Sequence, residues 1–245
     1  MKLPMVCMQC AFPTNGEAPD STLYSLPVRE DSVYEFTCPR GHQAVTVIQE
    51  EKFEILFEIA INAIVDGYYR DAVASATSSL ERFYEFLVRV ICHAHEVPIE
   101  EFGKAWKSVA KQSERQLGMF LAAHILHFKK APELNGDQAS FRNDVIHKGL
   151  IPTKDQAIKY TNDILGLIRP LLIEVKTSLN ESVQALAMVR LKERHSRLGE
   201  TPRASMVIGS TVSLTLSVTE PHPTSIELSL KRIEERKAEV SKRAK

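Results

Sequence analysis

The sequence lacks any excess of charge, because 31 lysines and arginines balance 31 aspartates and glutamates. Zero net charge excludes a general electrostatic attraction to polyanions, so any contact with nucleic acid must be local. The balance conceals a gradient: residues 1–50 hold three basic and six acidic side chains, whereas residues 201–245 hold eight and five. We therefore expect an acidic head, a neutral middle and a basic tail.

Long apolar runs are also missing. No stretch approaches the roughly 18 apolar residues that span a bilayer, and the first ten residues, MKLPMVCMQC, lack the apolar core of a signal peptide. Four cysteines do not form a disulfide framework in a chain of 245 residues, and their spacing points to a reducing compartment. The sequence therefore predicts a cytoplasmic protein that does not associate with membranes.

Apolar spacing divides the chain into four segments. Residues 1–48 are rich in turns with short apolar runs, which is typical of a small β-rich module. Residues 49–180 repeat apolar side chains at helical spacing and predict an antiparallel bundle of about five helices. Residues 181–204 predict a helical extension that ends at Gly199. The expected fold class is therefore mainly α, with a small β-rich module at the N-terminus.

The fourth segment, residues 205–245, begins with alternating apolar and polar side chains up to Thr219, which predicts a β-strand. A single strand is not stable in water, so it must pair with Ile226–Leu230 as a hairpin, with the N-terminal module, or with a second protomer. The last 15 residues carry seven basic side chains and predict a basic helical tail.

The N-terminal module contains a candidate metal site. Cys7 and Cys10 form one Cys-x2-Cys pair, and after 27 intervening residues Cys38 and His42 form a second pair. Two tight turns of this kind bring four side chains onto one tetrahedral ion, and a module this small needs such a crosslink. The pattern resembles a zinc ribbon, so we expect a structural Zn²⁺ bound by these four residues. A redox Cys-x-x-Cys pair beside an unrelated surface histidine is the alternative, and Cys92 is interpreted as a buried helical thiol.

A second informative segment is the helix predicted over Gln138–Lys148, with Asp137 as its N-cap and Gly149 as its stop signal. It carries Arg142, Asn143 and His147, and the helical repeat places Asn143 and His147 on one face. An imidazole can transfer protons to and from ribose or phosphate oxygens, and a guanidinium can stabilise the charge that builds on a phosphate.

The Arg142-Asn143-x3-His147 motif, after a long helix that includes Gly67–Val73 and Leu80-Glu81, resembles the HEPN superfamily over about residues 50–180. The resemblance implies a metal-independent endoribonuclease of a defence or toxin system, whose composite site forms between two protomers. It implies Arg142 and His147 as the catalytic pair and Asn143 as an accessory residue, with Glu81 as a further acidic residue.

The same Arg-x4–6-His spacing also occurs at Arg89/His95 and Arg190/His195, which we interpret as solvated helix faces. For the main motif the structural alternative is a helix end, with Arg142 paired to a carboxylate and His147 near the negative end of the helix dipole. His124 and His127 are interpreted as ordinary core or surface residues.

The leading hypothesis is therefore a homodimeric HEPN-type ribonuclease that cleaves RNA, with the zinc module and basic tail holding the substrate. It includes an antitoxin or another protein as a possible partner. The second hypothesis is a non-catalytic HEPN scaffold that binds a partner protein through the zinc module and the strand after residue 205. A third, a DNA reader built on the zinc module, is disfavoured because residues 1–50 are net acidic.

Overall fold

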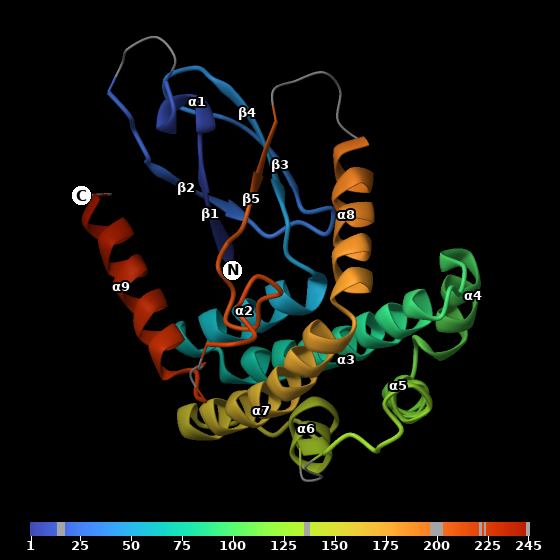
Figure 1. Cartoon of the computed structure of the whole chain (residues 1–245). Coiled ribbons are helices and arrows are strands. Elements are labelled where there is room, and N and C mark those ends of the chain that lie inside the picture. The colour runs from blue at the N-terminus through green and yellow to red at the C-terminus, as the bar shows by residue number, and fades with distance from the viewer. Residues whose placement is uncertain (14–17, 135–137, 197–202, 221, 223, 244–245) are drawn as a thin grey trace. The chain divides into compact units, whose positions relative to one another are not determined.

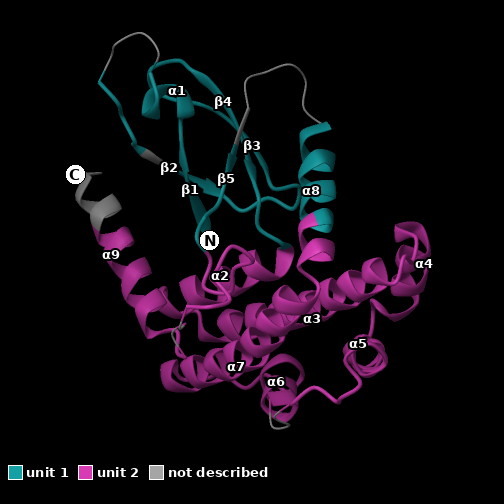
Figure 2. Cartoon of the chain, in the orientation of Figure 1, with its two compact units in different colours: residues 1–51, 185–209 teal, residues 52–184, 210–245 magenta. Residues whose placement is uncertain are grey.

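The computed structural model of the chain describes all residues except 14–17, 135–137, 197–202, 221, 223 and 244–245 (Figure 1). The chain divides into two compact units (Figure 2). Unit 1 comprises residues 1–51 and 185–209, and unit 2 comprises residues 52–184 and 210–245. Among the described residues, no helix has both the length and the apolar character needed to cross a bilayer.

Unit 1 contains the strands, as the turn-rich composition of the N-terminal segment predicts. β1 (Lys2–Val6) pairs antiparallel with β2 (Leu23–Pro27), and the short helix α1 (Met8–Ala11) follows β1 directly. A second sheet has the order β3–β4–β5, formed by β3 (Val33–Thr37), β4 (Gln43–Ile48) and β5 (Arg203–Met206). Leu191 of α8 (Asn180–Ser196) packs on the apolar face of β3 and β4.

The strand predicted from residue 205 to Thr219 is mostly wrong. In the described part of this region only Arg203–Met206 forms a strand, and it pairs in parallel with β4, which is one of the three pairings that the sequence leaves open. Within the described residues, 207–219 contain no strand. The expected hairpin partner Ile226–Leu230 does not form a strand, because from Glu227 onward it belongs to α9 (Glu227–Arg243). This helix confirms a basic helix at the C-terminus.

Buried carboxylates explain why the alternating segment is not a strand. The backbone N–H of Leu214 donates to Glu54 Oε1 at 2.9 Å, and the N–H and Oγ1 of Thr211 donate to Glu58 Oε1 at 2.6 and 2.7 Å. Both glutamates lie on α2 (Lys52–Val65) and are buried. Backbone donors that strand pairing would otherwise use are thus taken by side chains about 150 residues away, within unit 2.

Unit 2 is helical, and α3 is its central helix. α3 contacts α2, α4, α5, α6 and α7 (Figure 1). Its apolar face packs on α2 through Phe53 and Phe83, whose ring centroids lie 5.1 Å apart, and on α5 through the stacked rings of Tyr84 and Phe120 at 4.6 Å. The bounds are α3 (Tyr69–Ala94), α4 (Ile99–Val109), α5 (Ser113–Phe128), α6 (Gln138–His147) and α7 (Lys154–Ser178).

The turn between α6 and α7 sets the end of the helix that carries the HEPN-like motif. Gly149 adopts a φ of 76°, a left-handed conformation that glycine tolerates best, and it follows α6 as predicted. Thr153 then caps α7 through a capping box with Gln156. The predicted N-cap Asp137 and the predicted helix end at Gly199 lie outside the described residues.

Candidate functional site

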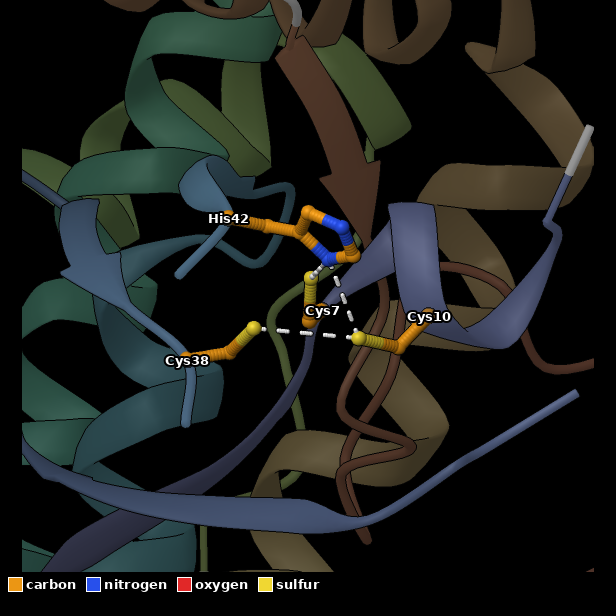
Figure 3. Close-up of side chains that lie close together, drawn as sticks. All are labelled: Cys7, Cys10, Cys38 and His42. Atoms are coloured by element: carbon orange, nitrogen blue, oxygen red, sulfur yellow. Dashed lines mark hydrogen bonds between the residues drawn. The ribbon is translucent and has the colours of Figure 1, made fainter. Parts of the chain in front are cut away.

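Three cysteines and one histidine meet in unit 1. The ligand atoms of Cys7, Cys10, Cys38 and His42 all lie within 4.8 Å of one another, and the three cysteines are buried (Figure 3). Cys10 Sγ lies 3.7 Å from Cys38 Sγ and 3.2 Å from His42 Nδ1, and Cys7 Sγ lies 3.8 Å from the same nitrogen. We refer to these four residues as the Cys3His cluster.

Two tight turns build the cluster, as their spacing predicts. In the first, the N–H groups of Cys10 and Ala11 donate to the Cys7 carbonyl at 3.1 and 2.9 Å, which starts α1. In the second, the N–H of Gly41 donates to the Cys38 carbonyl at 2.8 Å, and Gly41 has a φ of 82°. β3 ends at the second turn and β4 begins after it, so the pairing of these two strands holds the second turn in place.

The protonation chemistry of the thiols fits a cation at this place. Burial, together with the neighbouring sulfurs, raises the pKa of Cys10 to about 12, so without a cation this thiol is protonated. Burial also opposes ionisation of Cys38, but backbone N–H groups of His42 and Arg40 stabilise its thiolate and give a net lowering of its pKa. A bound cation supplies the charge that buried thiolates need.

The spacing of the sulfurs also fits a metal. Two thiolates on one tetrahedral ion, with metal–sulfur bonds of about 2.3 Å, lie about 3.8 Å apart, close to the 3.7 Å between the Cys10 and Cys38 sulfurs. All four cysteines of the chain are free, and Cys92 lies on α3 of unit 2, where it is only partly buried and not buried as predicted. A redox pair beside an unrelated histidine does not account for the position of His42. The Cys3His cluster can therefore hold a metal ion.

In unit 2, Arg142 projects from α6 into a network with α3 and α5. Its Nη2 lies 3.3 Å from Glu81 Oε1 and 3.0 Å from Ser113 Oγ, and Ser113 Oγ donates to the same Glu81 oxygen at 2.5 Å. Nη1 of Arg142 donates to Asn143 Oδ1 at 3.0 Å. The buried Nε of Arg142 has no partner among the described residues. The guanidinium is thus held in place by three side chains.

The other two residues of the motif are placed differently. Asn143 and Arg142 both line a cavity of about 220 Å³, to which Glu81 and Ser113 also contribute. His147 is the last residue of α6, is exposed, and does not line this cavity. The described residues give His147 no hydrogen-bond or ion-pair partner. A single chain therefore joins Arg142, Asn143 and Glu81 but leaves His147 facing solvent.

Sequence reasoning missed two members of this site. Ser113 bridges Arg142 and Glu81, and Tyr160 lines the cavity while sharing a 2.8 Å hydrogen bond with Thr77. Ser113 lies on α5 and Tyr160 on α7, outside α6 itself, and neither belongs to a local motif. The pairing of Arg142 with a carboxylate was one of the two expected outcomes for that residue.

Arg190 and four further histidines of the chain have structural contacts. Arg190 forms an ion pair with Glu51 within unit 1, and His195 shares a 2.9 Å hydrogen bond with Ser205. His95 Nε2 lies 3.1 Å from His127 Nδ1 in unit 2. The buried His124 bonds Glu174 Oε2 at 3.0 Å and the Lys130 carbonyl oxygen at 3.1 Å, and with its two ring nitrogens satisfied it is a core residue.

The comparisons with known proteins found no family model, no curated protein and no solved structure that matches the chain.

Proposed function

We propose that the protein is a HEPN-type, metal-independent endoribonuclease that acts as a homodimer in a defence or toxin system. One observation carries the proposal: a single ten-residue helix, α6, holds Arg142 in a defined side-chain network and presents at its end an exposed His147 to which the described residues give no partner. A guanidinium and an imidazole on one rigid element are the groups that metal-free cleavage of a phosphodiester requires. The HEPN-like motif supports the same reading.

In the proposed reaction, the 2′-hydroxyl of a ribose attacks the adjacent phosphorus. A new P–O2′ bond forms and the P–O5′ bond breaks, which leaves a 2′,3′-cyclic phosphate and a 5′-hydroxyl. His147 takes the proton from the 2′-hydroxyl as general base and then, as general acid, delivers it to the leaving 5′-oxygen. Arg142 stabilises the negative charge on the non-bridging oxygens. Asn143 orients the guanidinium, to which it is already hydrogen-bonded.

The arrangement on α6 favours a site shared by two copies. With 3.6 residues per turn, Asn143 and His147 are separated by about 40° around the helix, whereas Arg142 and His147 are separated by about 140°. One phosphate therefore does not easily meet Arg142 and His147 of the same helix. Two α6 helices facing each other across a twofold axis would let the arginine of one copy and the histidine of the other meet one phosphate.

For the Cys3His cluster we propose Zn²⁺ in a structural role. Three sulfurs and one imidazole nitrogen form a complete tetrahedral shell for zinc and leave no position for a catalytic water. The ion would crosslink the two tight turns and so stabilise unit 1, whose core is small. In this proposal the metal module and the basic α9 help to hold RNA, while the chemistry takes place at α6.

The test is cleavage of end-labelled RNA in EDTA, with the metal content of the protein checked before and after. We expect wild type to produce 2′,3′-cyclic phosphate ends, and His147→Ala and Arg142→Ala to lower the rate by about a hundredfold or more. His95→Ala, which replaces an exposed histidine at the C-cap of α3, is the matched control and should keep full activity. Equal rates for wild type and His147→Ala would overturn the proposal.

A second candidate is a non-catalytic scaffold that binds a partner protein. It is favoured by the commitment of Arg142 to Glu81, Ser113 and Asn143, which is what a structural arginine needs. In this case Arg142→Ala and His147→Ala leave the biological effect of the folded protein intact, and deletion of residues 205–219 abolishes it. Arrest of growth on expression of wild type but not of His147→Ala would argue for the ribonuclease.

A further inference from the structure

The cavity beside Arg142 has walls that are mainly apolar. Residues of α3, α5, α6 and α7, together with Leu134, line a cavity of about 220 Å³. Four leucines contribute side chains, together with the rings of two tyrosines: Leu80, Leu117, Leu134, Leu167, Tyr84 and Tyr160. An apolar cavity of about 150 Å³ is known to take up benzene, so this one has room for a bicyclic aromatic ring. All of these residues belong to unit 2.

The charged groups at this cavity carry more negative than positive charge. Its lining includes two carboxylates, Glu81 and Glu114, and one guanidinium, Arg142. Glu81 and Arg142 offset each other through their ion pair, so the cavity keeps about one negative charge. Glu114 is exposed, in the first turn of α5, and the described residues give its carboxylate no partner. An amine at the mouth of the cavity would provide one.

The hydrogen-bonding groups point to the same polarity. The Nη atoms of Arg142 already donate hydrogen bonds to Glu81, Ser113 and Asn143. A ligand anion would have to compete with these three acceptors. By contrast, Glu81 Oε2 and both oxygens of Glu114 accept no bond from the described residues, so three carboxylate oxygens are available to a ligand, whereas on the donor side Arg142 Nε is buried without a partner. The electron-rich faces of tyrosine rings also attract cations.

We propose that this cavity is a binding site for a small aromatic amine, with its ring between the leucines and its ammonium group at Glu114. The site needs one chain only and therefore does not rest on the proposed ribonuclease function. Exposed Ala139 and Glu114 are among the lining residues, so the cavity reaches the surface on the α5 and α6 side. A ligand can enter there without unfolding of the helices.

Three probes with the same ring and different charge test the polarity: tryptamine, indole and indole-3-acetate. Binding to the full chain is measured by calorimetry and ligand-observed NMR. For ligands of this size we expect a dissociation constant of about 1 mM or below for tryptamine. Indole should bind about tenfold more weakly, because it lacks the charge-assisted hydrogen bond, and indole-3-acetate more weakly still.

Two variants locate the site. Glu114→Gln should remove the roughly tenfold preference for tryptamine over indole, while leaving indole binding unchanged. Ala139→Trp should fill the mouth and abolish binding of all three probes, whereas Ala122→Trp, an exposed alanine on α5 that does not line the cavity, should not. Equal affinity for tryptamine and indole-3-acetate, tryptamine binding by Ala139→Trp, or no binding of any probe at millimolar concentration overturns the proposal. RNA cleavage is assayed separately, so each proposal can fail alone.

Discussion

Arg142 Nη2 on α6 and Glu81 Oε1 on α3 lie 3.3 Å apart, although the two residues are 61 positions apart in the sequence. Ser113 of α5 bonds both side chains, so one small network joins three helices. The side chains of Arg142 and Glu81 are 19% and 23% exposed, which places the pair between a surface and a buried ion pair. Their interaction therefore contributes to stability and fixes the guanidinium at the same time.

Replacing Glu81 by glutamine should destabilise unit 2 modestly. The substitution keeps the size of the side chain but removes the charge that Arg142 and Ser113 contact. We expect a loss of about 1 kcal/mol, measured as a fall in Tm of about 2–4 °C by calorimetry. Glu101→Gln, which removes the exposed partner of Lys104, is the matched control and should leave Tm unchanged. Equal shifts in the two variants would mean that the network adds nothing beyond a surface pair.

Metal binding should depend on the Cys3His cluster alone. Wild type and Cys92→Ser are expected to carry about one zinc per chain by elemental mass spectrometry, because one complete tetrahedral shell is present. Cys10→Ser should carry almost none, since it replaces a thiolate that lies against both Cys38 and His42. Loss of the ion should also make trypsin cleave the chain faster after Arg29 and Arg40 of unit 1. Full zinc content in Cys10→Ser would remove the cluster from the proposal.

The cluster was predictable because each half of it is local. Cys7 and Cys10 sit on one turn and Cys38 and His42 on another, and only the meeting of the two turns depends on the fold. The network of Arg142 was predictable in kind, since a partly buried guanidinium needs a carboxylate. Ser113 was not predictable, because nothing in its own neighbourhood marks it and its role comes from the packing of α5 on α3.

The wrong prediction for residues 207–219 has a different cause. Alternation of apolar and polar side chains describes which side chains are buried, but not where the backbone hydrogen bonds go. Here Glu58 of α2 accepts the hydrogen bond of the Thr211 N–H, and Glu54 accepts that of the Leu214 N–H. The Lys176 ammonium donates to the Leu216 carbonyl. Long-range side-chain partners of this kind leave no trace in a local pattern.

Glu58 should therefore be a major determinant of how the C-terminal segment is attached in unit 2. Glu58→Ala leaves the N–H of Thr211 without its acceptor and removes one partner of Arg232, so we expect a loss of about 2 kcal/mol or more. The corresponding fall in Tm is about 4–8 °C. Glu235→Ala, on the exposed face of α9, serves as the control with little change. If Glu58→Ala unfolds at the wild-type temperature, the glutamate does not hold this segment.

Glu50 should make the stability of unit 1 depend on pH. Its side chain is buried, one oxygen accepts the N–H of Ile208, and the other has no partner among the described residues. Burial raises the pKa of this carboxyl group despite the nearby amides and Arg194. A raised pKa means that the folded state binds the proton more tightly, so the contribution is fully present below the unfolded pKa and is lost as pH rises through the folded one.

Urea unfolding of wild type and Glu50→Gln at pH 5 and pH 7 measures this effect, because glutamine cannot titrate while its amide oxygen can still accept the N–H of Ile208. The free energy of unfolding of wild type, relative to Glu50→Gln, should be higher at the lower pH. Both proteins keep the same Cys3His cluster, so any release of metal by acid cancels in the difference. A difference that is constant, or that grows with pH, would show that Glu50 remains ionised in the folded unit without cost.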